Sequence, residues 1–525
     1  MSERLANSRR LTFIAIAGVF VLFVVTGLRG IDFGHHWDEK IQRRAVKAAV
    51  KDETLLPRFY NYPSVAFWIS VAAAAPEISD AVHVDPSSDL FEIDKPSLFE
   101  FLDGDEYELR ARRLFLLASA LAILWVALAA LADGRAPGTA LFAAALLGCS
   151  WEFAYHARWP APDTVMAQFT ALCLAALLAA RSRPRPGTWC LLAAVAAGLA
   201  AGTKYPGGLL LFAVVPACVH HASREGRSAV RAGVAAVLLF GATYLATTPG
   251  TILQPRLFWN HVTYEATHYS KGHWGFTVDA GLDHLTHALR YLSFELFSAH
   301  PAIATLFSLL AILGAALLWR ESRPVFALLV VLPLVYLSYM ASHRVLFVRN
   351  LLFLAPFGAL LAARGAGYVA GRLPRAAAAG WCSLLALALV ANAGTLIASA
   401  EEIRGRGADA LGHDLASYLG AHPDQRFHLS KHARRSLLEA GLEVPAHAEY
   451  PEAQADAIAC TPDELRGHLL WPANAPPGLL ATIGPRSVNY RWYTTWNEPW
   501  IAVVTPEFAD WARTVIWHPQ EPDTN

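Results

Sequence analysis

Long apolar segments constrain the fold of this chain more than any other feature. A segment of about 17–25 mainly apolar residues is long enough to cross a bilayer as a helix. The composition agrees, because 55% of the 525 residues are hydrophobic and only 16% are charged, which is too apolar for an average soluble enzyme. We therefore predict a multi-pass α-helical membrane protein. About eleven segments qualify as spans: 11–28, 113–132, 137–155, 164–180, 188–203, 205–220, 229–247, 299–319, 324–341, 345–363 and 376–398.

Arginine is unevenly distributed between the two sets of loops that these spans define. Loops 181–185, 224–231, 320–323 and 364–375 are rich in arginine, like the N-terminus. The short loops on the other side carry only four cations: Arg158, Lys204, Arg344 and Arg349. Since positive loops stay in the cytoplasm, the N-terminus is predicted to be cytoplasmic. Residues 401–525 are then extracytoplasmic.

Two large loops share the extracytoplasmic side with the C-terminal region. The first, about 30–112, contains WDEKIQRRAVKAAV, whose apolar spacing predicts an amphipathic helix lying at the membrane interface. The apolar run 64–75 is too short for a span, so we predict a helix lying on or dipping into the outer face. The second loop is 249–298. Residues 401–525 mix ALGHDLASYLGAH with strand-like PGLLATIG and PWIAVVT, which predicts a small α/β domain.

Charge and cysteine usage exclude several function classes. The formal net charge is zero, so nothing in it favours a nucleic-acid partner. The six cysteines form no CxxC pair and no metal-ligand spacing, and Cys460 is alone in the polar C-terminal region, where no disulfide is expected.

Asp38 and Glu39, in the stretch GHHWDEK, follow the first span closely. Acids at a helix start are favoured by the positive end of the helix dipole, so one interpretation is a solvated helix start. The other is a general base at the membrane boundary.

The next two extracytoplasmic loops carry further polar candidates. HARWPAPDT contains Arg158 and Asp163, and Asp163 is expected to cap the helix that starts near Thr164. GTKYPGG places Lys204 in a tight connection between two short helices. Its ammonium group either extends to the interface or binds a lipid phosphate.

The loops before and after residue 300 supply the remaining candidates. In NHVTYEATHYSKGHWG a helix would place four side chains on one face: His261, Tyr264, Glu265 and His268. His261, Glu265 and His268 together could ligate a metal, although no HExxH spacing supports this. In SHRVLFVRN, Arg344 and Arg349 are either interfacial anchors or phosphate ligands.

These motifs together resemble the GT-C superfamily of integral-membrane glycosyltransferases. The nearest branch is similar to the protein O-mannosyltransferases and lipid A aminoarabinose transferases (glycosyltransferase family 39-like). The resemblance covers roughly residues 11–400 and does not extend to the tail from 401, so we expect a transmembrane domain of residues 1–400 and a separate domain of residues 401–525. The motifs that carry it are HWDE, RFYNYPSVAFW, LRARRLF, HARWPAPDTVMAQF, GLAAGTKYPGGLLL, THYSKGHWG and FVRNLLFLAPF.

The resemblance implies a GT-C fold and an extracytoplasmic active site in a bacterial inner membrane. It assigns the catalytic base to Asp38, with Glu39 beside it, and a sugar on a polyprenyl phosphate as the donor. The implied reaction is an inverting transfer to an envelope acceptor that is a protein, a lipid or a glycan. The residues implied to bind the donor phosphate or sugar are Arg158, Asp163, Lys204, His261, Tyr264, His268, Arg344 and Arg349.

One departure from the family concerns the metal site. The lipid A transferase branch has a Glu-Lys-Pro-Pro run where this chain has Asn61, Tyr62, Pro63 and Ser64. The metal-binding glutamate of that branch is therefore missing. We expect no required cofactor, while a divalent ion on the His261 face is left as the alternative.

Two other functions are consistent with the same segments. A transporter or flippase of a lipid-linked sugar would place its ionisable groups near the membrane midplane. A non-catalytic envelope assembly factor would act through residues 401–525. The clustering of polar candidates at one set of helix ends favours chemistry on one face of the membrane.

Overall fold

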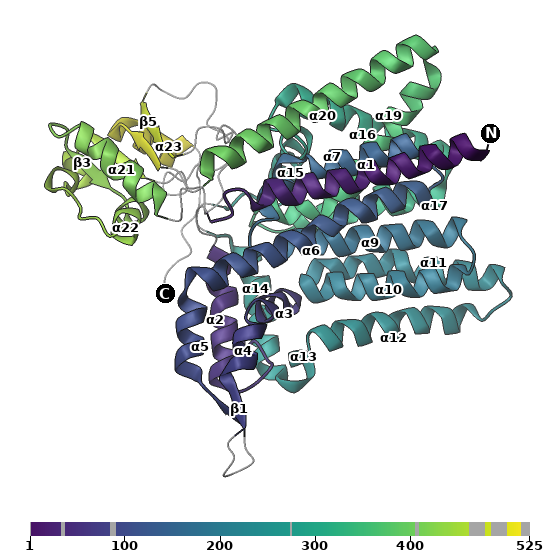
Figure 1. Ribbon diagram of the computed structural model, residues 1–525, viewed down its shortest axis with the longest axis horizontal. Helices are drawn as coiled ribbons and strands as arrows, with labels where there is room; N and C mark the ends of the chain where they lie inside the picture. Colours follow the sequence, from purple (N-terminus) through teal and green to yellow (C-terminus); the bar gives the residue numbers. More distant parts are fainter. Residues whose placement is uncertain are drawn as a thin grey trace.

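The computed structural model describes residues 2–32, 37–84, 91–273, 276–404, 409–460, 478–484 and 501–515. Most of these residues lie in a bundle of long, roughly parallel and antiparallel helices (Figure 1). Ten helical segments of the described chain are long and apolar enough to cross a membrane: Arg10–Leu28, Asp105–Ala132, Pro162–Ser182, Pro186–Thr203, Tyr205–Arg224, Ala229–Thr247, Pro301–Glu321, Arg323–Ala341, Val348–Arg372 and Arg375–Glu402. The multi-pass helical fold predicted from the sequence is thus confirmed.

The helices that make up the bundle follow one another with short connections. They are α1 (Ser2–Leu28), α6 (Asp105–Ala132), α7 (Pro137–Gly148), α8 (Trp151–His156), α9 (Pro162–Ser182), α10 (Pro186–Thr203), η1 (Tyr205–Leu210), α11 (Leu211–Arg224), α12 (Ala229–Thr247), α16 (Pro301–Glu321), α17 (Arg323–Phe326), η2 (Ala327–Val331), α18 (Leu332–Ala341), η3 (Val348–Leu354), α19 (Ala355–Arg372) and α20 (Arg375–Ile403).

One predicted span, 137–155, differs in the structure. It forms a 12-residue helix, α7, followed by the separate short helix α8. The break lies at Cys149 and Ser150, where the Ser150 hydroxyl accepts a hydrogen bond from the Phe153 N–H and so begins α8. Serine at this place favours a helix start over a helix interior. Together α7 and α8 still return the chain across the bundle.

Small residues allow the bundle helices to approach closely. A Cβ atom on Gly314 of α16 would collide with the backbone of Leu361 in α19, and one on Gly365 of α19 would collide with the backbone of Leu310. Glycine at a helix contact lets two backbones approach, as is common between membrane helices. GAGYVAG, around Gly365, therefore has a packing role.

Two ends of the bundle can be distinguished. At the α2 end, where α1, α10 and α18 finish, the chain forms additional short helices (Figure 1): α2 (Trp37–Lys51), α3 (Val65–Ala73), α4 (Ala75–Ala81), α5 (Lys95–Asp103), α13 (Gly250–Leu253), α14 (Pro255–Lys271) and α15 (Leu282–Phe294), with the antiparallel strands β1 (Val82–Val84) and β2 (Phe91–Ile93). The other, arginine-rich end carries the connections after α6, α9, α11, α16 and α19. The predicted helix within 64–75 is present as α3.

The amphipathic helix predicted in the first loop is present as α2, but its surroundings differ from the prediction. Ala45 and Ala49 on its apolar face are buried in a protein core with Leu98 and Leu102 of α5 and with Phe67 of α3. The sequence interpretation of a helix on the membrane interface is therefore corrected. The partner helix α5 was not recognised from the sequence, and it covers the face that was expected to meet lipid.

The C-terminal region forms a small mixed sheet with helices, as predicted. The strand order is β3-β4-β6-β5, with β3 parallel to β4 and the other neighbours antiparallel. Phe427, Leu437 and Val503 contribute to its separate core. Its elements are α21 (Ala410–Ala421), β3 (Phe427–Leu429), α22 (Lys431–Glu439), η4 (Ala446–Ala448), η5 (Glu452–Gln454), β4 (Ala457–Cys460), β5 (Leu479–Ile483), β6 (Ile501–Val504) and α23 (Pro506–Val515).

Candidate active site

Four charged side chains from distant parts of the chain meet at the α2 end of the bundle. Arg349 Nη2 lies 3.7 Å from Asp38 Oδ2, and Arg349 Nε lies 3.4 Å from Asp163 Oδ2. Lys204 Nζ donates hydrogen bonds to Asp163 Oδ1 at 2.5 Å and to Asn350 Oδ1 at 2.6 Å. Asp38, Asp163, Lys204 and Arg349 are called the charged cluster below. The structure thus brings four of the sequence-predicted site residues together.

Local structure explains why each side chain of the charged cluster points inward. Asp38 lies in the first turn of α2, and Asp163 follows Pro162 in the first turn of α9. Lys204 lies between α10 and η1 and has an extended backbone (φ −152°, ψ 135°), so it belongs to neither helix. Arg349 lies in the 3₁₀ helix η3. All four charged side chains therefore come from the first turn of a helix or from the connection between two helices.

Burial and neighbouring charges set the ionisation of Asp38. The side chain is fully buried, and burial raises the pKa of Asp38 to about 6, because a low-dielectric surrounding disfavours the charged carboxylate. Arg349 opposes this increase, Asp163 adds to it, Lys204 again opposes it, and Glu265 adds to it. A carboxyl group with a pKa near 6 exchanges its proton near neutral pH, which suits a general base.

Glu39 is directed away from the charged cluster. Arg112 of α6 donates to both of its carboxylate oxygens, from Nε to Oε1 at 2.5 Å and from Nη2 to Oε2 at 3.0 Å. Arg112 also donates to the carbonyl of Ile31 at 2.5 Å and to Glu108 at 2.6 Å. Glu39 therefore joins α2 to α6, and Arg112 extends this link to Ile31 in the turn after α1. The catalytic role that Glu39 was predicted to share with Asp38 stays a prediction, and the structure shows its carboxylate bound by Arg112.

Asp163 was predicted to cap α9, and the structure contradicts this prediction. The N-cap residue of α9 is Ala161, which makes no side-chain hydrogen bond, and Asp163 comes two positions later. Its carboxylate contacts Lys204 and Arg349 instead.

The two arginines of SHRVLFVRN lie in different environments. Arg349 is 3% exposed within the charged cluster. Arg344 is partly exposed, and its Nη2 lies 3.6 Å from Asp279 Oδ1 in the loop before α15. Arg344 was predicted as a phosphate ligand, and the structure does not place it in the charged cluster.

The histidine-rich helix α14 lines a cavity of about 420 Å³ beside the charged cluster. As predicted, His261, Tyr264, Glu265 and His268 share one face, and all four line this cavity. Ile41, one turn beyond Asp38 on α2, lines it too. The wall is completed by Phe59, Asn61, Tyr62 and His273. An aromatic, polar hollow therefore lies next to the buried Asp38.

His261, Glu265 and His268, the possible metal ligands, each contact a different partner. His261 Nδ1 accepts a hydrogen bond from the Tyr60 N–H at 2.9 Å, and Glu265 Oε1 accepts one from Asn61 Nδ2 at 2.5 Å. His268 lies against His273, with their ring nitrogens 3.0 Å apart. Within the described residues no group of three or more His, Cys, Asp or Glu side chains is arranged to hold a metal ion. Asn61, which stands where the family has a metal-binding glutamate, binds Glu265.

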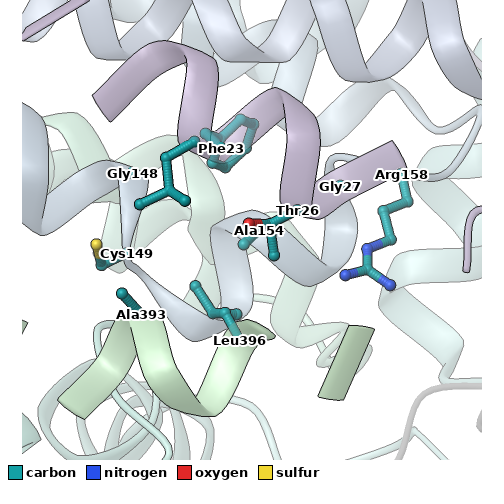
Figure 2. A pocket seen from close by; sticks show the side chains of 10 residues that line it. Phe23, Thr26, Gly27, Gly148, Cys149, Ala154, Arg158, Ala393 and Leu396 are labelled. Atoms are coloured by element: carbon teal, nitrogen blue, oxygen red, sulfur yellow. The ribbon is translucent and has the colours of Figure 1, made fainter. Parts of the chain in front are cut away.

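Arg158 lies in a separate, small pocket. This pocket holds about 10 Å³, roughly the space of one water molecule, between α1 and α20. Figure 2 shows Arg158 near Thr26 and Gly27 of α1, while Ala393 and Leu396 of α20 form the opposite side. In the described part of the chain Arg158 makes no ion pair. Burial lowers its pKa to about 10, which still leaves it charged at neutral pH. The structure does not join Arg158 to Asp163, with which it was grouped from the sequence.

Sequence reasoning missed several neutral neighbours of the charged cluster. The Tyr62 ring lies 5.6 Å from Lys204 Nζ, and Asn350 links Lys204 to the hydroxyl of Tyr269. Tyr62 and Asn350 both occur inside quoted motifs, RFYNYPSVAFW and FVRNLLFLAPF, so their position beside charged candidates was the available signal. The first residues of GHHWDEK, 34–36, and two of THYSKGHWG, 274–275, lie outside the described residues.

One family model matches part of the chain. Residues 90–263 match the family model described as Dolichyl-phosphate-mannose-protein mannosyltransferase. This segment contains Asp163 and Lys204, whereas Asp38 and Arg349 lie outside it. No sequence among the curated proteins matches the chain.

Several solved structures are similar to this chain at low sequence identity. ArnT from Cupriavidus metallidurans bound to undecaprenyl phosphate is 14% identical with a TM-score of 0.46, over 97% of this chain and 99% of that chain. The Archaeoglobus fulgidus oligosaccharyltransferase in the apo form is 13% identical with a TM-score of 0.48, over 84% and 65% of the two chains. AglB of the same organism, with an inhibitory peptide and a dolichol-phosphate, is 12% identical with a TM-score of 0.48, over 83% and 64%. The predicted resemblance to the GT-C glycosyltransferases is confirmed where the family model matches: over residues 90–263 this membrane protein has the sequence pattern of the dolichyl-phosphate-mannose-protein mannosyltransferase family.

Proposed function

We propose that this protein transfers a sugar from a polyprenyl-phosphate donor to a hydroxyl group of an envelope acceptor, with inversion at the anomeric carbon. The observation that carries the proposal is the charged cluster itself. One buried carboxyl group with a pKa near neutrality, Asp38, lies 3.7 Å from a guanidinium that suits a phosphate, Arg349. The family model over residues 90–263 supports the same class of donor.

The proposed chemistry is a single displacement. Asp38 takes the proton of the acceptor hydroxyl, and the oxygen forms a bond to the anomeric carbon. The bond from that carbon to the phosphate oxygen breaks, and its electron pair leaves with the polyprenyl phosphate. One displacement inverts the configuration. A phosphate leaving group needs cations rather than an acid, so a second carboxylic acid of the kind that a glycosidase uses has no task here.

Arg349 and Lys204 are the proposed cations for the leaving phosphate. Both already bind Asp163, so the donor phosphate would exchange with this carboxylate or share the cations with it. Asp163 in this account holds the two cations in place before the donor arrives. Because Arg349 and Lys204 supply the positive charge, the proposal assigns no step to a metal ion and requires no cofactor.

The cavity beside the charged cluster is the proposed entrance for sugar and acceptor. Its wall combines Tyr264 stacked on His268, with ring centroids 6.0 Å apart, and the polar pair Asn61 and Glu265. Aromatic faces with a few polar groups suit a sugar ring, which has both apolar faces and hydroxyl edges. His261, Tyr264 and His268 therefore keep their predicted role in donor or acceptor binding.

The proposed location is a bacterial inner membrane with the α2 end and the C-terminal domain outside. Support comes from the arginine-rich connections, which all lie at the opposite end of the bundle, as the positive-inside rule requires of cytoplasmic loops. A polyprenyl tail could then stay in the outer leaflet while its phosphate reaches Arg349.

A transfer assay with defined donors tests the proposal. Purified protein in liposomes would be given a panel of radiolabelled polyprenyl-phosphate hexoses and pentoses, together with an envelope extract as the acceptor. We expect release of polyprenyl phosphate and a labelled product with inverted anomeric configuration, determined by NMR. Donor that crosses the bilayer with its sugar–phosphate bond intact would instead establish a flippase and contradict the proposal.

A further inference from the structure

A second and larger cavity lies at the arginine-rich end of the bundle, far from the charged cluster. It holds about 860 Å³ between α9, α11 and the helices α17 to α18. Most of its lining is apolar, including Phe212, Pro216, Leu328 and Val331. Nothing in the proposed transfer reaction uses it. A cavity of this size is within the range of small-molecule binding sites.

The dimensions of this groove match one leaflet of a bilayer. Its lining on one side runs from Pro324 to Val335, roughly 17 Å of helix at 1.5 Å per residue. The hydrocarbon core of a bilayer is about 30 Å thick, so the groove extends from the interface to near the midplane. Phe212 is 72% exposed and Val331 is 42% exposed, which leaves the groove open toward the lipid. An acyl chain therefore fits its length and can enter from the side.

The charges at the groove are all of one sign. Arg181 and Arg224 line it at the end of α9 and the end of α11, next to His220 and His221. Among the described residues that line it, none carries a carboxylate. Arg181 donates to the Ser322 hydroxyl at 3.2 Å, and neither arginine forms an ion pair with the described residues. Glu225, which follows Arg224, lies close enough to act electrostatically on His221, but its carboxylate forms an ion pair with Arg227.

The backbone of one wall departs from regular helix. Ala327–Val331 forms a π-helical turn between α17 and α18, and three of its residues line the groove: Ala327, Leu328 and Val331. A π-helical turn is less stable than α-helix and occurs frequently at functional sites. It supports a built groove rather than a chance gap between helices.

We propose that this groove binds one anionic phospholipid. Its phosphate is held by Arg181 and Arg224, and one acyl chain lies along the apolar wall between α11 and α18. Guanidinium groups bind phosphate with two parallel hydrogen bonds, and basic pockets between membrane helices bind anionic head groups. The proposal is independent of the transfer reaction, because the charged cluster lies at the other end of the bundle.

Lipid retention measured by native mass spectrometry tests this proposal. The full-length protein would be reconstituted in nanodiscs of phosphatidylglycerol and phosphatidylcholine, extracted, and delipidated stepwise in detergent. We expect wild type to retain one phosphatidylglycerol. The double variant Arg181→Gln/Arg224→Gln should bind it about tenfold more weakly or worse, because it loses charge-assisted hydrogen bonds. The control variant Arg183→Gln/Arg231→Gln removes the same charge from exposed positions at the same end and should retain the lipid.

A second variant tests the apolar part of the groove without changing its charge. Ala217→Trp would fill the space of the acyl chain and should also release the lipid, while a sharp size-exclusion peak shows that the protein is folded. Equal retention by wild type, the double variant and the control would mean non-specific surrounding lipid and overturn the proposal. In a second set of nanodiscs that also contain undecaprenyl phosphate, its retention in preference to phosphatidylglycerol would overturn the choice of a phospholipid.

Discussion

At the scale of single residues, Arg349 is the proposed phosphate ligand of the charged cluster. It contacts both Asp38 and Asp163, whereas Arg344, five residues earlier, pairs with Asp279 in a partly exposed loop. We expect Arg349→Ala to lower donor use by about ten- to a hundredfold, since a charge-assisted contact contributes about 1.5–3 kcal/mol. Arg349→Lys keeps the charge but loses the planar guanidinium, so its donor use should lie between those of wild type and Arg349→Ala. Steady-state kinetics with a short-chain donor measure this.

Arg344→Ala is the matched control for that series. It removes an arginine from the same motif but leaves the charged cluster intact, so it should transfer sugar at a rate close to that of wild type. If Arg344→Ala is the damaging change and Arg349→Ala is harmless, the phosphate site has been assigned to the wrong arginine.

The ionisation of Asp38 predicts a pH dependence. A general base acts in its deprotonated form, and the pKa of Asp38 is about 6. kcat/KM should therefore be lost as pH falls through about 6 and be constant above it, because this parameter reports the free enzyme. Arg349 lowers the pKa of Asp38, so Arg349→Ala should move this limb to higher pH. A pH–rate profile without an acid limb, or an unchanged limb in Arg349→Ala, would show that Asp38 does not control the rate.

Residue types and motif positions were predictable, but partners were not. Asp38, Asp163, Lys204 and Arg349 are far apart in the sequence, and helical spacing gives no information on which loops meet. Glu39 shows the limit most clearly. It is adjacent to Asp38 in the chain, yet successive helix residues point in different directions, and its partner Arg112 comes from another helix.

At the scale of elements, the α10–η1 connection controls the position of Lys204. A Cβ atom at Gly207 would lie 2.5 Å from the carbonyl carbon and oxygen of Ala200, so η1 packs directly on the backbone of α10. Gly207→Ala should therefore displace η1 and Lys204, lowering both thermal stability and transfer. Gly208→Ala adds the same methyl group where the nearest atom is 3.9 Å away, and it should be neutral. Melting curves in detergent and transfer rates compare the two variants.

Equal behaviour of the Gly207 and Gly208 variants would contradict this packing account.

Hydropathy alone predicted the spans well: every predicted segment except 137–155 coincides with a candidate span. The exception shows what composition cannot detect. The segment is mostly apolar, and within it Ser150 is the N-cap of a second helix. For α2, the apolar face was predicted correctly, but its burial against α5 depends on a tertiary contact.

At the scale of the whole molecule, the two ends of the bundle differ in charge. The charged cluster and its cavity lie at the α2 end, and the arginine-rich connections lie at the other. The positive-inside rule then predicts that the α2 end and the C-terminal domain are outside the cell. The arginine distribution in the sequence predicted which loops lie at which end, but the 860 Å³ groove was not foreseen, because its walls come from helices that are distant in the sequence.

Cysteine labelling tests the orientation. Cys382 is exposed and the other five cysteines are buried, so a Cys382→Ser background removes most reaction with an impermeant maleimide. In spheroplasts we expect Glu443→Cys, on the exposed surface of the C-terminal domain, to be labelled and Ser182→Cys, after α9, to be protected until the membrane is opened. The reverse pattern would invert the molecule and move the charged cluster to the cytoplasmic side.

The most direct measurement of the central claim separates donor binding from transfer in Asp38→Asn. This change removes the base but keeps the shape of the side chain, so donor affinity should stay within a few-fold of wild type. Single-turnover transfer should fall by about 10²–10⁴, the usual contribution of a general base. Asp52→Asn, at the exposed end of the same loop region, is the control and should transfer normally. If Asp38→Asn binds donor and transfers sugar within about tenfold of wild type, then Asp38 is not the base and the charged cluster is not the active site.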